Sequence, residues 1–227
     1  MINKGKLFRK KINRNIDEDN IIELNLEGEK LGPSDIEYLT TNFNLKNLQI
    51  LDLNSNSIKS KGMLYLSQYK FPSLEFLNVS NNKIGDEGVY NIANGLFKKL
   101  KSLHLSNNSI TSEGIKYLVK AEFVNYLVDL SLSDNKKISD IGIRFIKEHK
   151  EWKQLKVLNL ENIGLNDIGL NYLYQATNSM PKLIDINIRD NRFTDNGNAI
   201  IKDLKKKHYI ILKPGDDRKE EDEEKVY

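Results

Sequence analysis

The chain has 227 residues, of which 39% are hydrophobic and 30% charged, and 35 basic against 32 acidic side chains leave a formal net charge of +3. Cysteine is absent, which excludes disulfide frameworks, cysteine nucleophiles and thiolate metal sites in these residues. No apolar run reaches the roughly 18–20 residues that span a bilayer, and the basic start of the chain has no apolar stretch typical of a secretory signal. We therefore expect a soluble, cytoplasmic protein.

The chain begins with a basic segment. Six Lys and Arg side chains precede the first acidic residue, and apolar residues between Leu7 and Ile16 recur at near-helical intervals. We expect residues 1–20 to form a basic N-terminal cap, with a helix that covers the next part of the chain. An alternative hypothesis is that residues 4–14 bind the phosphates of a nucleic acid or of an anionic membrane.

One motif of apolar residues then recurs seven times. It consists of an apolar residue, two residues of any kind, a second apolar residue, one further residue and a third apolar residue, and it starts at positions 21, 48, 74, 100, 127, 155 and 183. The alternation at its end predicts a short strand with one buried face. In six repeats a glycine column follows, and apolar residues then return at helical spacing: Gly62, Gly88, Gly114, Gly142, Gly169 and Gly197. Each unit is therefore predicted to be strand, turn, helix and turn.

This pattern resembles the leucine-rich repeat family, and its period is similar to the ribonuclease-inhibitor-like type with repeats of 26 to 28 residues. The resemblance implies an α/β fold, a right-handed solenoid or horseshoe with a concave parallel β-sheet and convex helices. We assign seven repeats to residues 21–207, a terminal strand to residues 208–213 and a disordered charged tail to residues 214–227. We see no second globular domain.

An asparagine column follows the strands: Asn56, Asn82, Asn108, Asn135 and Asn191. Its side chains are expected to bond backbone groups that are left free where the chain turns away from each strand. Ile163 occupies this position in the sixth repeat. We expect a local adjustment of the turn there.

Residues between the buried strand positions must face the concave side, because side chains alternate along a strand. Four such columns hold eight acidic side chains against one fixed base, Arg189. This acidity predicts a protein partner with a basic surface. Ile50 and Phe76 are expected side by side on adjacent strands of this polar face, as an interface anchor. The candidate partner-binding residues are Ile50, Asp52, Phe76, Asn78, His104, Asp129, Ser131, Val157, Asn159, Glu161, Asp185, Asn187 and Arg189.

The same residues allow a purely structural interpretation, because polar side chains are ordinary on the strand face of such a sheet. An aromatic column lies on the predicted helices, where each ring directly precedes a core residue: Tyr38, Tyr65, Tyr117, Phe145 and Tyr172. It could grip a partner or stack on bases. Rings wedged between neighbouring helices, with their polar ends in water, are the interpretation that we favour.

Catalysis and metal binding are weakly supported. Asp129, Ser131 and His104 could lie on adjacent strands, but an open curved sheet provides neither a closed pocket nor an oxyanion hole. Metal binding by His104 with Asp129 would rest on a single imidazole. We therefore predict no enzyme activity, no metal and no cofactor, and we expect neither a nucleic-acid partner nor an oligomer.

The resemblance implies a non-catalytic scaffold for protein–protein interaction. It also leaves an alternative open, because members of the same subfamily activate small GTPases. Arg144, Arg189 and Arg192 are the arginine candidates for such a role in the repeats. The abundance of Asn, Ile and Lys is compatible with a protist adaptor or with an effector of an intracellular bacterium that acts in a host cell.

Overall fold

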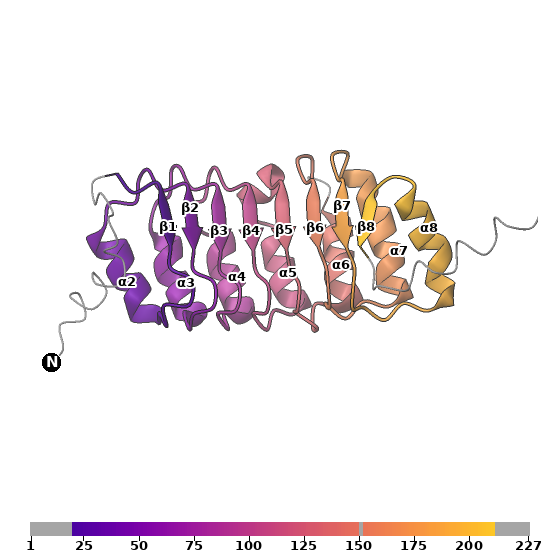
Figure 1. Ribbon diagram of the computed structural model, residues 1–227, viewed down its shortest axis with the longest axis horizontal. Coiled ribbons are helices and arrows are strands. Elements are labelled where there is room, and N and C mark those ends of the chain that lie inside the picture. Colours follow the sequence, from indigo (N-terminus) through magenta and orange to yellow (C-terminus); the bar gives the residue numbers. More distant parts are fainter. Residues whose placement is uncertain (1–19, 150–151, 212–227) are drawn as a thin grey trace, which may run out of the picture.

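A computed structural model describes residues 20–149 and 152–211. In this part of the chain, one open sheet of eight parallel strands runs the length of the molecule, in the order of the sequence (Figure 1). Each strand has three residues, so the sheet is long and narrow. The strands are β1 (Glu23–Asn25), β2 (Ile50–Asp52), β3 (Phe76–Asn78), β4 (Ser102–His104), β5 (Asp129–Ser131), β6 (Val157–Asn159), β7 (Asp185–Asn187) and β8 (Tyr209–Ile211).

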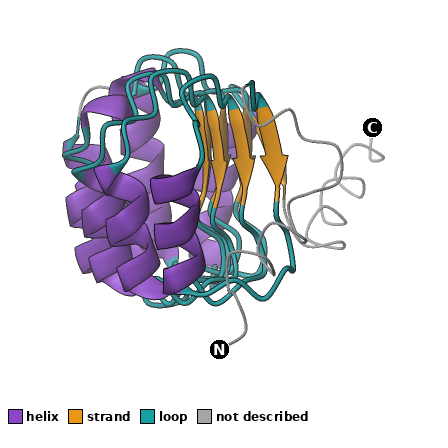
Figure 2. Ribbon diagram, turned by 90° about the vertical axis from the view of Figure 1, so that its left-hand side faces the viewer, coloured by secondary structure: helices purple, strands orange, loops and turns teal. Residues whose placement is uncertain are grey.

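Helices form a second layer on one face of the sheet, and the other face carries no helix of the described residues (Figure 2). The α-helices are α2 (Pro33–Asn42), α3 (Lys59–Gln68), α4 (Gly85–Ala93), α5 (Ser112–Leu118), α6 (Ser139–Glu148), α7 (Asp167–Ala176) and α8 (Asn198–Lys205). Three short 3-10 helices are η1 (Glu122–Tyr126), η2 (Thr177–Ser179) and η3 (Asp195–Gly197). The predicted α/β solenoid of strands alternating with helices is therefore confirmed.

The core lies between the two layers. The middle residue of each strand from β1 to β7 is buried against the helices, as Leu24, Leu103 and Ile186 illustrate. Each helix presents its own apolar residues to the same core, such as Ile115 and Leu118 of α5. A single strand and helix leave one face of their apolar residues open, so neighbouring repeats must stack to bury them.

The asparagine column forms the predicted ladder. The side-chain nitrogen of Asn108 donates to the carbonyl oxygens of Val79, Leu105 and Ser106, and its Oδ1 accepts from the backbone N–H of Asn82. Asn56, Asn82, Asn135 and Asn191 make the corresponding bonds to the carbonyl oxygens at the ends of two neighbouring strands. These side chains are buried or nearly so, and each joins two repeats where the strands end.

The sixth repeat lacks the asparagine of this column, and its turn has a different conformation. Ile163 is fully buried at that position, and the next residue, Gly164, adopts a φ of +85°. Oδ1 of Asn191 then accepts from the N–H groups of Ile163, Gly164 and Leu165, at 3.2, 3.1 and 3.0 Å. The expected local adjustment is confirmed, and it depends on a left-handed conformation that favours glycine.

Two predicted segments lie outside the described residues. The basic cap over residues 1–20 falls there except for Asn20, and so does the charged tail over residues 214–227. In the predicted terminal strand over residues 208–213, the described part contains β8, which pairs in parallel with β7.

Candidate functional site

The candidate residues share the sheet face that is turned away from the helices, which we call the concave face. Ile50 and Phe76 are direct partners in the register of β2 with β3, as the repeat spacing predicted. Ile50 is 37% exposed and Phe76 is half-buried. The two residues therefore lie on strands about 4.8 Å apart, and their side chains offer a partner an apolar contact within a polar surface.

The ring of Phe76 packs against a polar cluster on the next two strands. Its centroid lies 5.1 Å from that of His104, and the rings are in a T-shaped arrangement. His104 Nε2 is hydrogen-bonded to Asp129 Oδ2 at 2.9 Å, and Ser102 Oγ donates to the same oxygen at 3.1 Å. Each of these side chains is half-buried, so the cluster both orients Phe76 and displays an acid beside it.

Ser131 does not join that cluster. It is only 8% exposed, and its hydroxyl is hydrogen-bonded to the hydroxyl of Ser106, which also accepts from Ser133. Ser131, His104 and Asp129 therefore do not form a catalytic Ser/His/Asp arrangement. In the described residues, no group of three or more His, Asp and Glu side chains is arranged to hold a metal ion.

The acidic residues of the concave face differ in what holds them. Asp52 accepts from Asn78, Asn187 donates to Glu161, and Glu161 also pairs with Arg189 at 3.5 Å. These bonds hold the two carboxylates in place without fully neutralising them, since Arg189 is the one fixed base in these columns.

Asp134 and Asp190 occupy turn positions with a left-handed backbone conformation. Both adopt a left-handed φ, of +59° and +57°, in the turn after their strand. The equivalent positions hold Gly28, Ser55, Asn81, Asn107 and Asn162, which adopt the same conformation. Small polar residues tolerate this region better than others. The backbone therefore explains two of the eight acids that the sequence pattern attributed to a partner.

The thirteen candidates include ten half-buried residues, the buried Ser131, and Ile50 and Val157, both 37% exposed. Asp185 and Asn187 flank the buried Ile186 on β7, and Val157 and Asn159 flank the buried Leu158 on β6.

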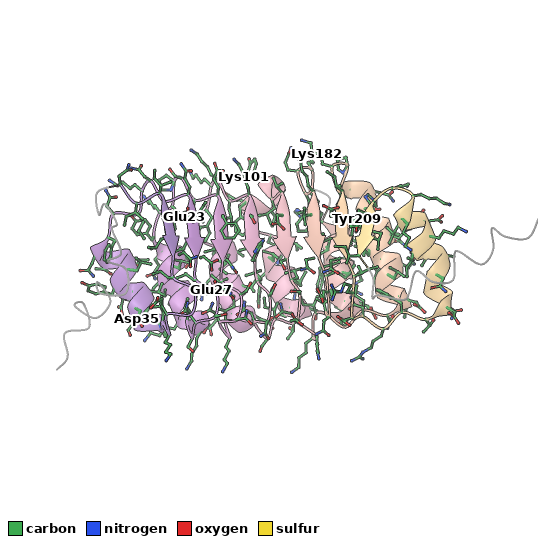
Figure 3. All side chains as sticks on the ribbon, viewed as in Figure 1. Glu23, Glu27, Asp35, Lys101, Lys182 and Tyr209 are labelled. Atoms are coloured by element: carbon green, nitrogen blue, oxygen red, sulfur yellow. The ribbon has the colours of Figure 1, made fainter. Side chains whose placement is uncertain are left out.

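Sequence reasoning missed one exposed aromatic residue of this face. Tyr209 is 68% exposed and continues the column of Ile50, Phe76 and Val157, because β8 pairs Tyr209 with Asp185 (Figure 3). The spacing of the terminal strand carried this information, but that strand lacks the leucine pattern that identified the other columns.

The aromatic column of the helices lies mostly against the core. Tyr38, Tyr65, Phe145 and Tyr172 are partly buried and packed on the hydrophobic core. Cationic side chains lie over three of the rings: Lys61 over Tyr65, Arg144 over Phe145, and Lys147 over Tyr172 at 4.9 Å. This arrangement supports the structural interpretation for these four rings, because they pack on the core and three of them have a cation over one face. Tyr117 instead contacts the ring of the exposed Tyr90, at 5.2 Å.

Comparison with known proteins agrees with the repeat geometry. The family model described as Leucine Rich repeat matches residues 44–67, 72–93, 98–119 and 125–147. Residues 44–147 thus contain four leucine-rich repeats. The match does not distinguish the ribonuclease-inhibitor-like type, which stays a prediction. None of the described helices is long and apolar enough to cross a membrane.

Individual proteins are similar to this chain in sequence or in fold. The chain is 38% identical to the Protein Cep78 homolog of Drosophila melanogaster over 61 residues, which are 26% of this chain and 8% of that protein. Internalin C2 of Listeria monocytogenes has a similar structure, with a TM-score of 0.54 and 19% identity over 92% of this chain and 91% of that one. A leucine-rich repeat protein of Leptospira interrogans gives a TM-score of 0.46 and 24% identity, over 83% of this chain and 48% of that one.

Proposed function

We propose that this leucine-rich repeat protein is a non-catalytic scaffold that binds a protein partner with a basic surface on its concave face. Leucine-rich repeat folds generally mediate protein–protein interaction. The observation that carries the proposal is the pair of Ile50 and Phe76 on adjacent strands. Glu23 of β1 pairs with Ile50, and Asp129 is hydrogen-bonded to His104, whose ring packs on Phe76. We further propose that binding takes place in the cytoplasm. Disulfides are rare in that compartment, and a chain without cysteine is consistent with it.

The chemistry of this surface supports a two-part recognition. Apolar contact over Ile50 and Phe76 would supply affinity, because buried aromatic anchors dominate interface energies. The carboxylates of the concave face would attract a basic partner and orient it, and this contribution fades as salt rises. Because the strands are parallel and the helices cover the other face, the concave face is rigid before binding, which limits the entropy lost on association.

The test is capture of partners from a cell lysate by the wild type and by the double variant Phe76→Glu with Asp129→Lys, at about 50 and about 300 mM NaCl. A matched control is Tyr90→Glu with Glu87→Lys, which has the same net change of charge and alters exposed residues of α4 on the helix layer. Thermal unfolding of each variant checks that the fold persists.

We expect the wild type and the control to capture the same partner, with less at the higher salt concentration, and the concave variant to lose it. A partner captured equally by all three proteins would contradict the proposal. A partner lost from the control alone would move the binding site to the helix layer.

A further inference from the structure

The basic side chains of the repeats are concentrated on one edge of the sheet. The loops that run from the end of each helix to the start of the next strand contain eleven lysines and two glutamates among the described residues. Over residues 26–197, the loops that run from each strand to the next helix contain six basic and six acidic side chains. We call the first set of loops the strand-start edge. Lys101 and Lys182 both lie on it, at the upper side of the view in Figure 3.

An apolar hollow opens on this edge, between the loops that precede β2, β3 and β4. Its volume is about 570 Å³, and Tyr69, Phe71 and Leu96 contribute to its wall. Leu96 is 45% exposed, and the same loop carries Lys98, Lys99 and Lys101. A recessed apolar surface of this kind suits one protruding apolar group.

The wall of the hollow is held rigidly. The hydroxyl of Tyr69 accepts a hydrogen bond of 2.8 Å from the backbone N–H of Leu45, in the preceding repeat. The ring of Tyr69 lies 4.7 Å from that of Phe71, and Phe71 stacks on Phe97 at 5.8 Å. A ligand therefore meets a preformed surface and need not order these side chains when it binds.

Three lysines surround the hollow: Lys46, Lys70 and Lys98. All three are exposed, and within the described part of the chain none of them forms an ion pair. Lys101, by contrast, already pairs with Glu75 at 2.8 Å. An occupant of the hollow would thus meet positive charge on several sides, with no carboxylate of the chain lining it.

We propose that this hollow is a second interaction site, which binds an acidic peptide segment through one apolar side chain flanked by Asp or Glu residues. The apolar side chain would fill the hollow, and the flanking carboxylates would lie against the three lysines. A membrane surface fits less well because the apolar wall is recessed. A nucleic acid fits less well because Tyr69 is the one partly exposed ring that lines the hollow, whereas single strands bind on a row of open ring faces.

The site is separate from the concave face in both position and charge. The proposed function recruits a basic partner there, whereas the strand-start edge would recruit an acidic one. The two sites can therefore be disabled independently, and one proposal can fail while the other holds.

The test measures the anisotropy of a fluorescein-labelled peptide of twelve residues with a central Phe between Asp and Glu residues, titrated with the full-length chain. We expect Leu96→Glu and Lys98→Glu each to weaken binding about tenfold. Lys156→Glu, which makes the same change of charge on the same edge but away from the hollow, should weaken it less than about twofold. The concave variant Phe76→Glu with Asp129→Lys should bind the peptide at least as well as the wild type.

A second peptide carries Ser in place of the central Phe, and its affinity should be about tenfold lower. Equal binding of the two peptides, or an equal effect of Lys156→Glu and Lys98→Glu, would overturn the proposal, because binding would then follow the charge of the whole edge. A single-stranded oligothymidine or a phosphatidylserine vesicle that binds more tightly than the peptide and depends on Leu96 would also overturn it, in favour of that class of partner. The fluorescence of Trp152 and the circular dichroism spectrum report whether each variant is folded.

Discussion

The carboxylate of Asp86 accepts a hydrogen bond of 3.0 Å from the backbone N–H of Gly114, one repeat further along the chain. It also accepts from the N–H and the hydroxyl of Thr111, at 2.8 and 2.7 Å. Asp86 thus caps the first turn of α5, where free N–H groups and the helix dipole favour a negative charge. Asp140 and Asp167 accept in the same way from the N–H groups of Asn166 and Thr194.

This relationship predicts the effect of a methyl group at the glycine column. A Cβ on Gly114 would lie 2.5 Å from Asp86 Oδ1 and 2.6 Å from a methyl carbon of Ile110. We therefore expect Gly114→Ala to lower the free energy of unfolding by about 1–3 kcal/mol. Urea unfolding monitored by the fluorescence of Trp152 measures this change.

The control for this prediction is Gly32→Ala. The nearest atom to a Cβ at Gly32 is 3.9 Å away, so the added methyl group meets no obstacle. Because Gly is preferred to Ala at a helix N-cap, we expect a loss smaller than that of Gly114→Ala, below about 1 kcal/mol. Equal losses in both variants would show that contact between Asp86 and Gly114 does not explain the glycine column.

The asparagine ladder is expected to be a major source of stability. Asn108→Ala would leave the carbonyl oxygens of Val79 and Leu105 and the N–H of Asn82 without this buried partner. We expect a loss of about 2–4 kcal/mol, because each buried group left unsatisfied carries a desolvation cost. Chemical denaturation checks this. Asn94→Ala is the control, since Asn94 is exposed and its side chain makes one bond, to Tyr90; a comparable loss there would argue against the ladder.

The cluster beside Phe76 predicts a separation of binding from stability. His104→Ala would remove the imidazole that packs on Phe76 and bonds Asp129. We expect the affinity for the concave-face partner to fall about tenfold, with a change in unfolding free energy below about 1 kcal/mol, since these side chains are partly solvated. Ser131→Ala, at a buried hydroxyl, should leave the affinity nearly unchanged. Titration calorimetry with the captured partner distinguishes the two variants.

One ion pair of α8 predicts a pH dependence. The hydrogen bond and charge of Lys206 lower the pKa of Asp203, and the same contact raises the pKa of Lys206. The contribution of Asp203 to stability is present above its pKa in the unfolded chain and is lost as pH falls through the lower pKa of the folded state. The contribution of Lys206 is present below its unfolded pKa and is lost as pH rises through the higher folded value.

Titration of the Asp203 carboxyl carbon by nuclear magnetic resonance tests this sign. In the variant Lys206→Met the pKa of Asp203 should rise toward its ordinary value. The side chains of Lys206 and Asp203 are 65% and 49% exposed, so solvent screens the pair and we expect little change in stability at neutral pH. A pKa of Asp203 that is the same in the variant and the wild type would show that the ion pair does not persist in solution.

The amino-acid sequence by itself determined the repeat, the alternation of strand and helix, the buried columns and the neighbours across the sheet. Ile50 and Phe76 could be placed side by side because a parallel sheet of equal repeats has one register that buries every leucine. The ladder could be predicted for a similar reason, since Asn82 and Asn108 recur at the same step as the strands that they join.

Apart from the strand register and the asparagine ladder, side-chain contacts between repeats were decided only by the tertiary structure. The sequence pattern shows that Asp86 and Gly114 belong to different units, but the stacking distance determines that a carboxylate fills the space of the missing Cβ. In the same way, Phe76 meets His104, and Tyr69 and Leu96 border one hollow, because side-chain rotamers and loop paths depend on the neighbouring repeat. A one-dimensional period determines which face a residue occupies, whereas packing in three dimensions determines what it touches there.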